Sequence, residues 1–67
     1  MVDITKLNVA LARNGITREK LAERIGIALS TMGRKISGES DFYRHEIIEI
    51  SKELNLTEDA TREIFFA

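Results

Sequence analysis

Apolar residues recur along this chain at three- and four-residue spacing, which is the period of an amphipathic helix. No stretch alternates between apolar and polar residues for long enough to predict a strand. The pattern therefore predicts an all-α fold of five helices. We expect the 67 residues to form one domain, 1–67, because the chain is long enough for a single core and no more.

The first two helices are delimited by capping residues. Asp3 is expected to cap the first helix, which Asn14 and Gly15 end, and Thr17 to cap the second, which Gly26 ends. The stripes expected to face inward are Ile4, Leu7 and Leu11 in the first helix and Leu21, Ala22 and Ile25 in the second.

Three more helices follow. The third is expected from Leu29 to Ile36, and Ser40 or Asp41 is expected to cap the fourth, with Phe42 near its start. Asn55 suits a left-handed position after the fourth helix, and Thr57 opens a short fifth helix. The residues expected to face inward are Met32, Ile36, Ile47, Ile50, Leu54, Ala60 and Ile64.

Charge is divided unevenly between the two halves of the chain. The net charge is −1, but residues 13–36 hold six basic and two acidic side chains, a net of +4. Residues 39–67 hold three basic and eight acidic side chains, a net of −5. A domain divided in this way can present a basic face to phosphate, although ordinary solvated helix faces would give the same counts.

Composition argues against several classes of function. The chain has no Cys and a single His, His45, so it offers no metal site, and it has no Gly-rich phosphate loop or catalytic His–acid pair. We expect neither an enzyme nor a cofactor, and no small-molecule substrate. No apolar run approaches the ~18 residues of a membrane span, and the N-terminus lacks a signal-peptide pattern, so a cytoplasmic location is expected.

The most informative segment is Thr17 to Gly38. Two short helices are expected to meet at Gly26, with small Ala22 where they cross and with Ile27 and Met32 filling the angle between them. This is the design of a helix-turn-helix, whose second helix is free to enter the major groove of DNA.

The whole chain resembles the Cro/repressor family of phage and bacterial regulators, also called the Xre or lambda-repressor-like family. The residues that carry the resemblance are Leu21-Ala22, Gly26-Ile27, Ser30-Thr31-Met32, Ile36 with Ser37-Gly38-Glu39, and the flanking Leu11, Gly15, Ile16, Thr17, Ile47, Ile50 and Leu54. The resemblance implies a five-helix lambda-repressor-like domain that binds double-stranded DNA.

The resemblance also implies which residues contact DNA. Those expected to face base edges are Ala28, Leu29, Ser30, Thr31 and Arg34, with Arg34 the best candidate for a bidentate contact with guanine. Those expected to contact phosphate are Thr17, Arg18, Lys35, Ser40, Tyr43 and Arg44.

Some features of this segment leave alternatives open. Ala28 stands where the family commonly has a capping Ser or Thr, and Leu29 either contacts a thymine methyl group or contributes to the core. Gly33, within the third helix, lets either DNA or another helix approach closely.

The leading hypothesis is a compact phage-type repressor that binds an operator as a homodimer and blocks a promoter. The chain is too short for the C-terminal oligomerisation domain of larger repressors, so Ile48, Phe65 and Phe66 are the candidate dimer contacts. For the two terminal Phe residues, the alternative is that one packs in the core. The alternative function is a protein-interaction module, an antitoxin or modulator, that uses its acidic second half.

Overall fold

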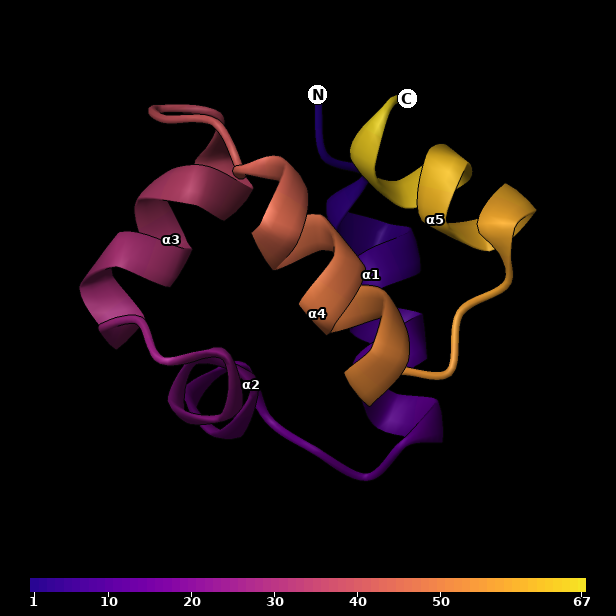
Figure 1. Ribbon diagram of the computed structural model, residues 1–67, viewed down its shortest axis with the longest axis horizontal. Coiled ribbons are helices and arrows are strands. Elements are labelled where there is room, and N and C mark those ends of the chain that lie inside the picture. Colours follow the sequence, from indigo (N-terminus) through magenta and orange to yellow (C-terminus); the bar gives the residue numbers. More distant parts are fainter.

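The computed structural model describes all 67 residues. It contains five α-helices and no strand, which confirms the predicted fold class (Figure 1). The helices are α1 (Ile4–Arg13), α2 (Arg18–Ile25), α3 (Leu29–Ser37), α4 (Arg44–Glu53) and α5 (Glu58–Phe65). None of them is long and apolar enough to cross a membrane.

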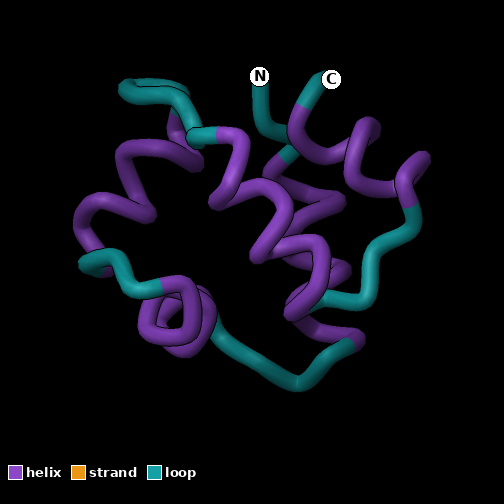
Figure 2. Tube along the Cα trace, viewed as in Figure 1, coloured by secondary structure: helices purple, strands orange, loops and turns teal.

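The helices form one compact body of 26 × 23 × 21 Å. In Figure 1, α2 and α3 lie on one side, α4 crosses in front of α1, and α5 closes the other side. Figure 2 shows the loops that join them, of which residues 38–43 form the longest. The two ends of the chain lie side by side, because the Asp3 N–H donates to the Ile64 carbonyl at 2.7 Å and the Ala67 N–H to the Met1 carbonyl at 3.2 Å.

All five helices contribute to a single core. Its members are Leu7, Ala10, Leu11, Leu21, Ala22, Met32, Ile36, Ile50, Leu54, Ile64 and Phe65. Four of them, Leu7, Leu21, Met32 and Ile50, are completely enclosed, and each such side chain contributes about 1.5–3 kcal/mol by leaving water. The prediction for Ile4 is wrong: it is 42% exposed and lies outside the core, to which α1 contributes Leu7, Ala10 and Leu11.

Three helices begin where a small polar residue caps them, as predicted. Asp3 Oδ1 accepts from the Lys6 N–H at 3.0 Å, Thr17 Oγ1 from Lys20 at 3.1 Å, and Thr57 Oγ1 from Ala60 at 3.0 Å. The left-handed conformation expected of Asn55 is also confirmed, with φ +51°.

The predicted start of α4 is wrong. Ser40 and Asp41 lie in the loop, and the N-cap is Tyr43. Phe42 stays outside the helix because its half-buried ring packs edge-on against Phe65, with the ring centroids 5.3 Å apart. Glu46 provides the cap instead, since its Oε1 accepts from the Tyr43 N–H at 2.8 Å.

Candidate nucleic-acid interface

Helices α2 and α3 are joined by a tight turn at residues 26–28. Gly26 has φ +78°, a conformation that glycine adopts without strain, and its N–H donates to the Glu23 carbonyl at 3.2 Å. The Ile27 N–H then donates to the Ala22 carbonyl at 3.0 Å. Ala22, whose carbonyl accepts this bond, lies within α2 and is buried, as expected of the small residue of this segment. The predicted helix-turn-helix is therefore present.

Helix α3 has one buried face and one open face. Met32 and Ile36 belong to the core, and Lys35 is buried beside them. The exposed residues of the helix are Leu29, Ser30, Gly33, Arg34 and Ser37. No other element covers this side, so α3 stands at the edge of the molecule with its outer face available to a partner (Figure 1).

Four of the five residues expected to face bases lie on or next to this open face. Ala28, Leu29, Ser30 and Arg34 are exposed, whereas Thr31 is half-buried. Leu29 is 48% exposed and lies outside the core, so the alternative that assigns it to the core is wrong. Arg34 makes no ion pair, which leaves its guanidinium free.

Gly33 lies in the middle of the open face. A Cβ atom built at Gly33 meets no other atom within 4 Å. No neighbouring helix therefore requires a glycine here, which removes one of the two explanations that the sequence left open. Because glycine costs a helix about 1 kcal/mol relative to alanine, the position lowers stability with no packing benefit inside the molecule.

The residues expected to contact phosphate from α2 are at its beginning. Thr17 is exposed and is the N-cap, and Arg18 is the first residue of the helix. The guanidinium of Arg18 donates to Asn8 Oδ1 at 3.3 Å, so a side chain of α1 orients it.

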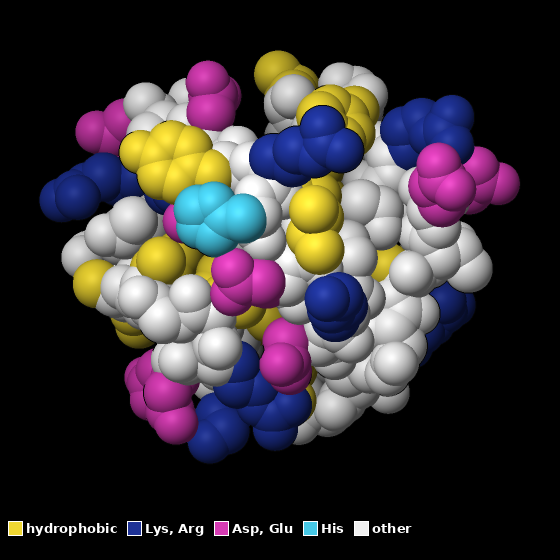
Figure 3. All heavy atoms as spheres, viewed as in Figure 1, with side chains coloured by type: hydrophobic (Ala, Val, Ile, Leu, Met, Phe, Trp, Pro, Cys, Tyr) yellow, Lys and Arg dark blue, Asp and Glu magenta, His cyan; other side chains and the backbone are white.

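A second group of expected phosphate contacts surrounds the start of α4. Ser40, Tyr43 and Arg44 are all exposed, and Tyr43 is 63% exposed. Arg44 is the first residue of α4 and makes no ion pair. The Tyr43 ring stacks against His45 with a centroid distance of 5.8 Å, and Figure 3 shows the single histidine against a hydrophobic ring on this face.

Lys35, unlike the other candidates for phosphate contact, is buried. It is only 6% exposed, and its Nζ lies 2.6 Å from Oε1 of Glu46, which is 3% exposed. The prediction that Lys35 contacts phosphate is therefore wrong, because its ammonium points into the molecule toward α4. Burial raises the pKa of Glu46, but the hydrogen bonds from Lys35 and from the Tyr43 N–H, and the charges of Lys35 and His45, together bring that pKa below its ordinary value of 4.5.

The basic surface is smaller than the sequence suggests. Lys20 pairs with Glu23 at 3.3 Å, and Arg24 pairs with Glu53 at 3.0 Å. Basic and acidic side chains are accordingly mixed on the face drawn in Figure 3. On α2, α3 and the start of α4, the arginines without an ion pair are Arg18, Arg34 and Arg44.

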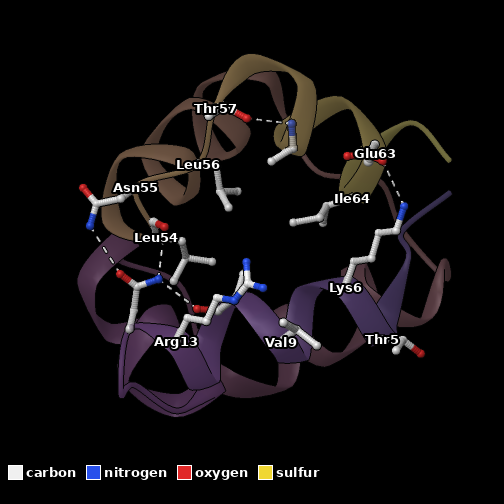
Figure 4. Close-up of a pocket in the computed structure, with 13 residues that line it drawn as sticks. Thr5, Lys6, Val9, Arg13, Leu54, Asn55, Leu56, Thr57, Glu63 and Ile64 are labelled. Atoms are coloured by element: carbon white, nitrogen blue, oxygen red, sulfur yellow. Dashed lines mark hydrogen bonds and ion pairs between the residues drawn. The ribbon is translucent and has the colours of Figure 1, made fainter.

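Arg13 belongs to a different part of the surface. It lines a groove of about 590 Å³ formed by α1, α5 and the loop before α5, to which α2 and α3 contribute no residue. Figure 4 shows the Arg13 side chain extending toward this groove, with Val9 on the same helix and Leu56 and Ile64 across from it. The sequence had grouped Arg13 with the basic residues of α2 and α3. In the structure Arg13 is not part of a continuous basic face with α3.

The three candidate dimer residues differ in exposure. Phe65 is 5% exposed and belongs to the core, so its assignment as a dimer contact is wrong, and the alternative in which one Phe packs is correct. Phe66 is 65% exposed and Ile48 is 46% exposed, and both remain available to a partner. They line separate hollows of the surface.

Two contributors to this region were not identified from the sequence. Glu46 lies three residues after the N-cap Tyr43, the spacing at which a carboxylate reaches back to the N-cap N–H, so its capping role had a local signal. The contact of Asn8 with Arg18 had no local signal in the sequence, because it joins two different helices.

Comparison with known proteins agrees with this geometry. Searches among curated proteins and among solved structures returned no match. A family model for the Cro/C1-type HTH DNA-binding domain matches residues 6–59, which include the whole of α2, α3 and α4 and end in the first turn of α5. The match covers most of the chain and contains the turn at Gly26 and the open face of α3. The chain therefore belongs to the Cro/C1-type helix-turn-helix family of DNA-binding domains.

Proposed function

We propose that this protein is a sequence-specific transcriptional regulator of the phage repressor type, which blocks a promoter by occupying an operator. The observation that carries the proposal is the open face of α3. It combines exposed Leu29 and Ser30 with the unpaired guanidinium of Arg34. Arginine can donate two hydrogen bonds to guanine, and an apolar side chain can contact a thymine methyl group, so the face suits base recognition in the major groove.

Phosphate contacts would come from the two ends of this surface. Thr17 and Arg18 lie at the start of α2, and Ser40, Tyr43 and Arg44 lie at and before the start of α4. Contacts of this kind fix the orientation of a protein on the duplex, and they carry little sequence information.

A homodimer on DNA is part of the proposal. One α3 can contact only a few base pairs, and helix-turn-helix dimers place two such helices in successive major grooves, ~34 Å apart. The domain is 21–26 Å across, so two neighbouring copies are of a suitable size for this spacing. The exposed Phe66 and Ile48 are the proposed contacts between copies.

A second candidate function is a protein-interaction module such as an antitoxin or modulator. The net charge of −5 over residues 39–67 and the 65% exposure of Phe66 favour it, since acidic side chains repel phosphate and an exposed aromatic ring suits a contact with another protein. The two candidates differ in whether duplex DNA is bound specifically at physiological salt.

Selection of bound duplexes from a random pool is the decisive experiment. The proposal expects enrichment of one sequence with two-fold symmetry and half-sites about one helical turn apart. Enrichment of a single unpaired half-site would contradict the dimer. If no sequence is enriched and a gel shift shows no binding, the interaction module becomes the better explanation.

A further inference from the structure

The only charged side chains inside the protein belong to one pair, Lys35 and Glu46. Eleven of the thirteen buried residues are apolar, and these are the other two. Lys35 is on the inner face of α3, and Glu46 is in the first turn of α4. Their Nζ–Oε1 distance of 2.6 Å is that of a short charge-assisted hydrogen bond.

The same carboxylate oxygen holds the start of α4. Glu46 Oε1 accepts from the Tyr43 N–H at 2.8 Å as well as from Lys35. The Tyr43 ring also covers the ammonium, with Lys35 Nζ 4.0 Å from the ring centroid. Lys35, Glu46 and Tyr43 thus connect α3 to the N-terminus of α4 across the loop at residues 38–43.

Stability does not explain this arrangement well. Removing two charges from water costs several kcal/mol for each ion, and buried pairs replaced by apolar residues of similar volume often give equally or more stable proteins. The pair does, however, fix the distance between α3 and the first turn of α4 and the side of α3 that faces α4. Lys35 precedes Ile36 and follows Arg34 in the same helix, so anchoring Lys35 to α4 also fixes the side of the molecule from which Arg34 projects.

We propose that Lys35 and Glu46 are positioning residues for DNA recognition, which hold the base-contacting face of α3 in register with the phosphate-contacting start of α4. This inference rests on the proposed function. Both helices would contact one duplex, so a rotation of α3 relative to Tyr43 and Arg44 would separate the base contacts from the backbone contacts. Specific binding would then weaken, while non-specific attraction to phosphate would stay the same.

The test replaces the pair with apolar side chains of similar length, in the variant Lys35→Met/Glu46→Met. Its melting temperature and its affinities for the selected operator and for random DNA are compared with those of the wild-type protein. The matched control is Lys6→Met/Glu63→Met, which removes an exposed pair between α1 and α5 with the same change in charge. We expect a folded protein with a melting temperature within several degrees of the wild type, because removing two buried charges stabilises it and losing the acceptor of the Tyr43 N–H destabilises it. We also expect the preference for operator over random DNA to fall at least tenfold, with binding to random DNA within twofold of wild type and the control unchanged.

An unchanged preference in the folded double variant would show that the pair is only structural, and would overturn the inference. If the double variant does not fold, Glu46→Gln takes its place. Its amide oxygen keeps both hydrogen bonds but loses the charge that strengthens them, so the preference should fall at least threefold. An unchanged preference there also overturns the inference. If wild-type protein enriches no sequence, the proposed function fails and this inference fails with it. If wild-type protein has an operator and the variants keep their preference, only the inference fails.

Discussion

The ring of Phe42 meets the ring of Phe65 edge-on, at 82° and with a centroid distance of 5.3 Å, and this contact joins the loop before α4 to the last turn of α5. Edge-to-face pairs of this kind stabilise a core beyond the area that they bury. The contact places Phe65 in the interior and leaves its neighbour Phe66 outside.

Two substitutions at adjacent positions should therefore differ strongly in their effect on stability. Phe65→Ala should lower the free energy of unfolding by about 3–5 kcal/mol, because it opens a cavity in the core. Phe66→Ser should change that free energy by less than about 0.5 kcal/mol, because the side chain is 65% exposed. Urea denaturation of both variants checks this difference.

The same Phe66→Ser protein tests the dimer. Titration of operator DNA should show weaker and less cooperative binding than the wild-type protein shows. Wild-type protein that saturates its operator as one copy would contradict the dimer, whatever the variant does.

Arg18→Ala should weaken binding to all DNA sequences about equally and reduce its salt dependence. The slope of log K against log salt is negative, and each lost phosphate contact reduces its magnitude by about 0.9. The matched control is Arg24→Ala on the same helix, where the arginine already pairs with Glu53 and should contribute little. Salt titrations of the two variants are the measurement, and equal effects would show that the ion pairs of the free protein do not predict its phosphate contacts.

Arg34→Ala should cost about 1–3 kcal/mol of binding free energy on the preferred site and relax the preference at one base position. The reason is the loss of a bidentate contact from the open face of α3. Affinities for a set of operators that differ at single positions provide the measurement. Equal weakening on operator and random DNA would instead assign Arg34 to a phosphate.

Gly33→Ala should stabilise the free protein by about 1 kcal/mol, since alanine favours a helix and a Cβ atom there meets nothing within 4 Å. If α3 enters the groove with this face, the added methyl group should at the same time weaken operator binding. Thermal unfolding and operator affinity are measured on the same preparation. A variant that is more stable and binds equally well would show that the DNA does not approach Gly33.

Stability should decrease in acid partly through Glu46. Its folded pKa is lowered, so its stabilising contribution is present above its unfolded pKa, near the ordinary value of 4.5, and is lost as the pH falls through the folded pKa. In Lys35→Met the carboxyl loses the hydrogen bond and the charge of Lys35, two of the causes that lower its pKa, while the Tyr43 N–H still donates to it. Its folded pKa should therefore rise relative to that of the wild type, and this variant should lose less stability as the pH falls. Urea unfolding at pH 3 to 8 measures both profiles. If the stability of the two proteins varies with pH in the same way, Lys35 does not lower the pKa of Glu46.

Local signals predicted most of the fold and part of the candidate site. Asp3, Thr17 and Thr57 cap helices through contacts three residues away, so the sequence alone locates those helix starts. The start of α4 depends on Phe42 meeting Phe65, a contact between residues far apart in the chain, and the prediction of Ser40 or Asp41 failed for that reason.

Arg34 and Lys35 show the same limit within the site. Both are basic neighbours in one helix, yet one is exposed and the other buried. Lys35 stands three residues after buried Met32 and directly before buried Ile36, so helical spacing did point it inward. Its partner Glu46 could not be predicted, because the path of the loop at residues 38–43 determines which side chain of α4 it meets.

Because the two chain ends are neighbours, the order of the helices along the chain can be changed without changing the fold. Lys6 and Glu63 are 57 positions apart in sequence and only 3.2 Å apart in space. A short peptide joining Ala67 to Met1, with the chain reopened in the turn between α4 and α5, would place α5 directly before α1 without changing a packed helix. Contacts between α5 and α1 would then become local, whereas contacts of α5 with α4 and the loop before it, such as Ser51 with Thr61 and Phe42 with Phe65, would become distant in sequence. Such a circular permutant would keep the α2–α3 surface intact and would fold by a different route to the same core.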